Sequence, residues 1–140
     1  MGGIESLPTA QFGFPGEMRD RLVRAILNGA KTATASLLVE YELEQEPLPV
    51  VGGRAAVLDS AGRRVAVIET TDVRVARFAD IDLAFARDEG EGFDSVDDWR
   101  RAHVRFWESG EVRAGLGRPD FRVDDDTQVV LERFRLIASR

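Results

Sequence analysis

The chain has 140 residues, of which 44% are hydrophobic and 31% charged, a composition typical of one globular domain and not of a disordered chain. The absence of cysteine excludes disulfides, thiolate nucleophiles and cysteine-based zinc sites, and a single histidine excludes a multi-histidine metal site. The net charge of −6 disfavours indiscriminate binding to polyanions but is compatible with a local basic surface.

No apolar run approaches the length of a membrane span, and the first residues lack the basic-then-apolar pattern of a secretion signal. We therefore expect a cytoplasmic protein that has no membrane partner, no metal and no cofactor. The sequence leaves the oligomeric state open.

The N-terminal part predicts an arm, a turn and a helix. Residues 1–11 show no periodicity, and we expect a flexible arm followed by a single domain over residues 12–140. A turn at 12–16 precedes a helix over 17–28, in which apolar residues recur at helical spacing. Gly29 is expected to end this helix, because glycine readily adopts the left-handed cap.

The middle of the chain predicts a hairpin. Residues 35–43 fit either a short helix or a strand, and residues 45–53, with two prolines and two glycines, predict a loop. Strands are expected over 54–59 and 64–75, joined by a tight turn. On the longer strand, Glu69 shares a face with valines by the period of two.

The C-terminal part predicts two helices and a strand. Residues 78–89 are expected to be helical, with Asp80 as the N-cap, and residues 95–109 form a second helix that begins with a capping box. Residues 111–126 are expected to be a long irregular loop, and residues 127–137 a final strand. This order favours an α+β domain in which a mixed, largely antiparallel sheet curls into a small barrel with helices over its mouth.

Lys31 is the only lysine of the chain, and the other 18 cationic side chains are arginines. Unlike arginine, lysine loses its proton when it is desolvated. Thr34 follows three residues later, so the two residues form a possible pair of amine and hydroxyl for nucleophilic chemistry, with the hydroxyls of Thr32 and Ser36 beside them. The alternative is a solvated loop that contains one lysine by chance.

Acidic residues supply candidates for proton transfer. Glu89 is expected in the last turn of its helix, where the helix dipole disfavours negative charge and makes a carboxylate a stronger base. Glu91 follows between two glycines, which suggests a backbone shaped to orient it. Glu69 is a further candidate near the rim of the sheet. The alternative for Glu89 and Glu91 is a solvated acidic turn.

The segment around Trp99 mixes aromatic and cationic residues and holds both tryptophans and the only histidine. Aromatic rings can stack on a base and arginine can contact phosphate, so Trp99, Arg100 and His103 are candidate ligand contacts. The alternative is a helix whose aromatic side chains pack in the core and whose histidine is a satisfied core residue.

Taken together, these motifs resemble the ASCH domains, relatives of the PUA domains. The resemblance covers nearly the whole chain and rests on Gly29-Ala30-Lys31-Thr32-Ala33-Thr34, Ala35-Ser36-Leu37, Glu40-Tyr41-Glu42, Val67-Ile68-Glu69-Thr70-Thr71, Glu89-Gly90-Glu91-Gly92, the spacing of Trp99-Arg100, His103 and Phe106, and Val130-Leu131-Glu132-Arg133-Phe134. The resemblance implies a PUA-like β-barrel with flanking helices.

Some small members of that family are N4-acetylcytidine amidohydrolases, and the resemblance implies Lys31, Thr34 and Glu89 as catalytic residues. The expected function is removal of an acyl group from a cytidine-type base, and the partner is a modified nucleoside or RNA. A non-catalytic RNA-binding module and a ribonuclease remain as alternatives. The chain departs from the small amidohydrolases in an extra segment after Lys31 and in its long region 95–126. The expected substrate contacts are Thr32, Ser36, Glu69, Glu91, Trp99, Arg100 and His103.

Overall fold

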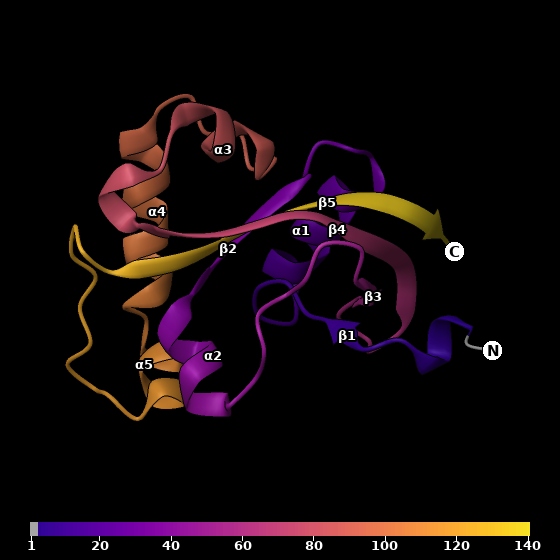
Figure 1. The fold of residues 1–140 in the computed structure, drawn as a ribbon, viewed down its shortest axis with the longest axis horizontal. Coiled ribbons are helices and arrows are strands. Elements are labelled where there is room, and N and C mark those ends of the chain that lie inside the picture. Colours follow the sequence, from indigo (N-terminus) through magenta and orange to yellow (C-terminus); the bar gives the residue numbers. More distant parts are fainter. Residues whose placement is uncertain (1–2) are drawn as a thin grey trace.

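The structure, a computed structural model, describes residues 3–140 and shows a mixed α+β fold (Figure 1). Its elements in chain order are η1 (Ile4–Ser6), β1 (Thr9–Ala10), α1 (Glu17–Leu27), β2 (Ala33–Leu37), α2 (Leu38–Glu44), β3 (Arg54–Leu58), β4 (Arg64–Arg77), η2 (Phe78–Asp80), α3 (Leu83–Asp88), α4 (Val96–Trp107), α5 (Gly110–Leu116) and β5 (Gln128–Ser139).

One five-stranded sheet has the order β1-β3-β4-β5-β2. The pairing of β1 with β3 is parallel, and the other three pairings are antiparallel. The predicted α+β class and mixed sheet are confirmed, but the sheet is not closed into a barrel. The edge strands β1 and β2 do not pair with each other, and β1 has only two residues with which to form a ladder.

Strong local signals predicted α1, the β3–β4 hairpin and α4 correctly. The Ser95 side chain accepts a hydrogen bond from the Asp98 backbone N–H, as a capping box requires. The segment left open, residues 35–43, contains both alternatives, because β2 runs directly into α2. The expected arm contains η1 and β1, and its residues 1 and 2 lie outside the described residues.

Two other expectations were wrong. Residues 78–89 are not one helix: a 3-10 turn precedes α3, and Asp82, not Asp80, caps α3 by accepting from the Phe85 backbone N–H. The expected loop at 111–126 contains α5, which Ser109 caps at its start. Gly115 gives α5 a low helix propensity, so the sequence pattern did not indicate this helix.

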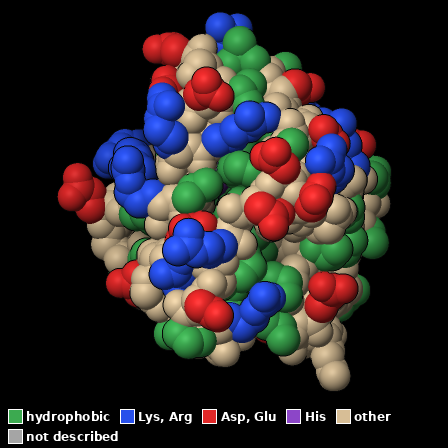
Figure 2. Space-filling model, turned by 90° about the vertical axis from the view of Figure 1, so that its left-hand side faces the viewer, with side chains coloured by type: hydrophobic (Ala, Val, Ile, Leu, Met, Phe, Trp, Pro, Cys, Tyr) green, Lys and Arg blue, Asp and Glu red, His purple; other side chains and the backbone are tan. Residues whose placement is uncertain are grey.

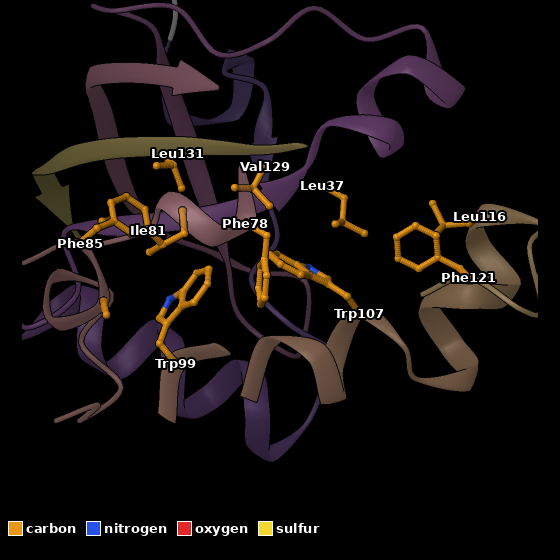
Figure 3. Packing of buried hydrophobic residues seen from close by; sticks show 12 residues of the cluster. Leu37, Phe78, Ile81, Phe85, Trp99, Trp107, Leu116, Phe121, Val129 and Leu131 are labelled. Atoms are coloured by element: carbon orange, nitrogen blue, oxygen red, sulfur yellow. The ribbon is translucent and has the colours of Figure 1, made fainter. Parts of the chain in front are cut away.

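Two hydrophobic clusters hold the elements together, one on each side of the sheet. In the first, α3, α4 and α5 pack against β2 and β5, with Phe78, Trp99 and Trp107 between α4 and the strands (Figure 3). In the second, α1 and Phe12 pack against β3, β4 and Phe134 of β5. Lys31 precedes β2, between the end of α1 and the α3–α4 region, and therefore lies where the two clusters meet. Within residues 3–140, no helix has both the length and the apolar character that crossing a membrane requires.

Candidate active site where α1, β2 and α3 meet

The segment that carries Lys31 is fixed by backbone hydrogen bonds to three elements. The Lys31 N–H donates to the Ala25 carbonyl of α1 at 3.0 Å, and the Thr32 N–H donates to the Asp88 carbonyl at the end of α3 at 2.8 Å. The Phe134 N–H of β5 donates to the Thr32 carbonyl at 3.0 Å. These bonds turn the Lys31 side chain inward, and the residue is only 3% exposed.

The Lys31 amine is surrounded by oxygen acceptors. Its Nζ donates to the carbonyls of Ala33 at 2.8 Å and Glu89 at 3.3 Å, and it lies 3.9 Å from Glu89 Oε2. An ammonium can make both bonds and keep a third hydrogen toward Glu89, whereas a neutral amine can make both and keep its lone pair. Burial lowers the pKa of Lys31, against the charges of Glu89 and Glu91.

A glycine allows Glu89 to approach Lys31. Gly90 has φ +74°, and a Cβ at this position would lie 2.7 Å from the Ala30 carbonyl carbon and oxygen and from the Lys31 Cα. Any other residue would clash with this backbone and would also be strained by the positive φ. The close crossing of the two chain segments therefore requires a glycine immediately after Glu89.

The Glu89 carboxylate is 2% exposed and meets three nitrogen groups. Its Oε1 accepts from the indole N–H of Trp99 at 3.1 Å, and its Oε2 lies 3.3 Å from His103 Nε2 and 3.9 Å from Lys31 Nζ. Burial alone would raise the pKa of Glu89, but the His103, Lys31 and Trp99 contacts outweigh it and lower that pKa. Glu89 is therefore held as a carboxylate inside the protein.

His103 is held as an imidazolium by its two partners. Its Nδ1 lies 2.9 Å from the Trp99 carbonyl, which can only accept, so Nδ1 carries a hydrogen. Nε2 faces the Glu89 carboxylate, which also only accepts, so Nε2 carries the second hydrogen. Burial opposes this charge, but Glu89 outweighs it and raises the pKa of His103. The ring also stacks on Trp99, with centroids 4.0 Å apart.

Glu91 lies at the more open side of the site. It is half-buried, and Arg21 of α1 approaches its Oε1 to 3.5 Å. Burial and the neighbouring Glu89 charge raise the pKa of Glu91. Glu91, Glu89 and His103 each place one potential ligand atom within 4.8 Å of the others, so these three residues could hold a cation. Such a cation would have to displace the proton that joins His103 to Glu89.

Of the predicted site residues, the structure brings together Lys31, Glu89, Glu91, Trp99 and His103. Thr34 directly follows Ala33, whose carbonyl accepts from Lys31, but no hydrogen bond joins the Thr34 hydroxyl to Lys31 or Glu89 among the described residues. Thr32 links β2 to α3 through the Asp88 carbonyl.

Trp99 contacts the site through its indole N–H and its stacking on His103, whereas Arg100, Glu69 and Ser36 lie in other surroundings. The Trp99 ring packs against Phe78 and Trp107 (Figure 3). The residue is fully buried, so the ring has no exposed face for a base. Arg100 donates to the Ala79 carbonyl at 2.7 Å. Glu69 forms ion pairs with Arg54 at 3.0 Å and Arg135 at 2.8 Å. Ser36 lies farther along β2, two residues beyond Thr34.

Sequence reasoning missed two neighbours of the site, Phe12 and Arg21. The Phe12 ring lies beneath the amine, with Lys31 Nζ 5.8 Å from its centroid, and Arg21 neutralises Glu91. Arg21 and Glu91 are 70 positions apart, so no local spacing signals their contact. Phe12 lies in the segment before α1, where no periodicity marks a buried side chain.

Comparison with known proteins places the fold. The ASCH domain family model matches residues 9–138. Protein EF3133 from Enterococcus faecalis V583 has a similar crystal structure, with 30% identity, a TM-score of 0.81, and coverage of 93% of this chain and 76% of that chain. An ASCH domain from Lactobacillus crispatus JV V101 is similar at 29% identity and a TM-score of 0.80, with coverage of 94% and 79% of the two chains.

The hypothetical protein PH0355 shares the fold at 16% identity, with a TM-score of 0.53 over 84% of this chain and 93% of that chain. The search of the curated proteins found no match. The family model covers nearly the whole chain and two structures align over more than nine tenths of it. This chain therefore belongs to the ASCH domain family.

Proposed function

We propose that the protein is an amidohydrolase that removes an acyl group from the exocyclic amine of a cytidine-type nucleoside, with Lys31, Thr34 and Glu89 as its catalytic residues. The observation that carries this proposal is the buried Lys31 amine, 3.9 Å from a Glu89 carboxylate that His103 and Trp99 hold in place. Burial lowers the pKa of this amine, which makes its neutral, proton-accepting form more accessible.

The proposed reaction uses Thr34 as the nucleophile. Its oxygen attacks the acyl carbonyl carbon while its proton moves to the Lys31 amine, and the same proton then passes to the leaving exocyclic nitrogen. This step forms a threonine ester and releases the free nucleoside. Water hydrolyses the ester to the carboxylic acid and restores the hydroxyl, again with Lys31 as the proton carrier. The Glu89 carboxylate stabilises the ammonium that Lys31 becomes during each transfer.

Thr34 would have to approach Lys31 when the ligand binds. Hydrogen bonds between catalytic groups are often long before substrate is present and shorten in the complex. The position of Thr34 directly after Ala33 supports this role, because the Ala33 carbonyl already accepts from the Lys31 amine. If water attacks the carbonyl directly, Thr34→Val keeps its activity while Lys31→Met loses it.

The test is acetate release from N4-acetylcytidine. We expect turnover by the wild type and a loss of at least about 100-fold in kcat for Lys31→Met, because general acid–base catalysis contributes roughly that factor or more. Thr34→Ser should retain activity and Thr34→Val should not. A chelator present throughout tests whether a cation at Glu89, Glu91 and His103 takes part. No acetate release by the wild type, or equal release by Lys31→Met, would contradict the proposal.

Net charge and surface disfavour the alternative in which the protein only binds RNA. The chain carries a formal charge of −6, and on the face in Figure 2 the Lys and Arg side chains are interspersed with Asp and Glu. On α4, Arg101 is paired with Asp98 and Arg100 bonds a backbone carbonyl. A protein that binds RNA tightly through phosphates, with affinity that falls steeply with salt and without turnover, would support that alternative.

A further inference from the structure

A group of hydroxyl and carboxyl side chains gathers around Glu132, in the middle of β5. Glu132 Oε2 accepts a hydrogen bond from the Thr70 hydroxyl of β4 at 2.7 Å. Thr34 of β2 lies opposite Glu132 in the β2–β5 register, so their side chains share one face, with Cβ atoms about 5 Å apart. Ser36 lies two residues beyond Thr34 and contacts the Tyr41 phenol. We call these five residues the Glu132 cluster.

The state of Glu132 is unusual for a carboxyl that serves only the fold. It is half-buried, and no lysine or arginine in the described part of the chain forms an ion pair with it. Burial raises the pKa of Glu132, against the Thr70 hydrogen bond. By contrast, Glu69 on the neighbouring strand is matched by two arginines. A carboxyl that is partly desolvated without a cation costs stability, which the single Thr70 hydrogen bond offsets only in part.

The Glu132 cluster is continuous with the Lys31 site. Phe134, two residues after Glu132 on the same face of β5, packs against Phe12 with ring centroids 6.0 Å apart. Lys31 Nζ lies 5.8 Å from the centroid of that same Phe12 ring. Thr34 belongs to the cluster and also directly follows the carbonyl that accepts from Lys31. Thr34 and Phe12 therefore connect the Glu132 cluster to the Lys31 amine.

We propose that Glu132, positioned by Thr70, binds the edge of a nucleobase on which an amino N–H adjoins a ring nitrogen, as in cytosine. This proposal rests on the proposed function for the identity of the base. In its protonated form the Glu132 carboxyl accepts from the amino group and donates to the ring nitrogen, so it matches that edge with two hydrogen bonds. The partly buried position beside the Thr70 hydroxyl, without a cation, favours that form. A phosphate would be poorly placed beside the Glu132 carboxyl, because no cation offsets its charge and burial already disfavours a negative charge there.

The test compares the binding of cytidine and 3-deazacytidine, which replaces the ring nitrogen with C–H. We expect the wild type to prefer cytidine by about tenfold, the equivalent of one net hydrogen bond, as measured by calorimetry. Glu132→Leu should bind both compounds equally. Glu132→Gln keeps one donor and one acceptor and should retain the preference. Glu111→Leu, on the exposed side of α5, is the matched control and should behave as the wild type.

Folding of each variant is checked by its melting temperature. If Glu132→Leu does not fold, Thr70→Val removes the hydroxyl that holds Glu132 and should reduce the preference while keeping the shape of the side chain. No measurable cytidine binding by the wild type, or an unchanged preference in Glu132→Leu or in a folded Thr70→Val, overturns the inference. If the preference for cytidine depends on Glu132 but the protein does not release acetate, the proposed reaction is contradicted and this inference stands. If the protein releases acetate and Glu132→Leu leaves the KM unchanged, this inference is contradicted and the proposed reaction stands.

Discussion

His103 and Glu89 form a buried ion pair, with His103 Nε2 3.3 Å from Glu89 Oε2 and residue exposures of 9% and 2%. Each residue stabilises the charged form of the other, because the pKa of His103 is raised and that of Glu89 is lowered. The pair therefore links the stability of the fold to the protonation of the candidate site.

The first prediction concerns stability and pH. The His103 contribution is fully present below its ordinary pKa of 6.5 and is lost as pH rises through the raised folded value. The Glu89 contribution is present above 4.5 and is lost as pH falls through the lowered folded value. The gap in unfolding free energy between wild type and His103→Gln should therefore be largest between these two ordinary values and should shrink on the alkaline side. Urea unfolding across the pH range measures this gap, and a pH-independent gap would argue against the charged pair.

The second prediction isolates the hydrogen bond that Trp99 donates to Glu89. Trp99→Phe and Trp107→Phe remove similar volumes from the same cluster, but only Trp99 donates to a buried carboxylate. Among residues 3–140, none accepts a hydrogen bond from Trp107. Trp99→Phe should therefore cost about 1.5–3 kcal/mol more than Trp107→Phe, the range for hydrogen bonds to charged groups. Equal losses in chemical denaturation would show that the indole N–H does not support Glu89.

The third prediction separates steric clash from backbone strain. Gly90 and Gly92 both have positive φ, +74° and +84°, but a Cβ at Gly92 would meet no atom within 4 Å. Gly92→Ala should cost about 1 kcal/mol from the backbone alone. Gly90→Ala adds the clash with Ala30 and Lys31, so it should destabilise more and should also reduce any activity of the Lys31 site. Thermal unfolding of the two variants compares the costs, and the account fails if Gly92→Ala is the more damaging change.

Local order was predictable where short-range chemistry decides it. The capping box at Ser95 and Asp98 and the alternating strand 64–75 depend on neighbours within a few residues, and both were predicted. The cap at Asp82 was missed because Asp80 offered the same chemistry two residues earlier. Closure of the sheet could not be judged, because it depends on whether β1 and β2 meet, which no local pattern encodes.

The candidate site was predicted in its residue types but not in its connections. Lys31 was a candidate because it is the only lysine, and Glu91 because glycines flank it. Glu89 was a candidate because it was expected at the end of a helix. The contact between Lys31 and Glu89 spans 58 positions and needs the crossing at Gly90, which no periodicity reveals. Glu132 was noted only as part of the motif of the final strand, because a glutamate on a strand gives no sign of its role until its partners are known.

The central claim is that the Lys31 amine is buried and readily loses its proton. Because Lys31 is the only lysine, selective isotope labelling of lysine gives one side-chain NMR signal, whose pH titration reports this amine alone. The account predicts a midpoint below the ordinary value of 10.5, and a still lower midpoint in Glu89→Gln, which removes the charge that holds the proton. A midpoint at or above 10.5, unchanged by Glu89→Gln, would contradict it.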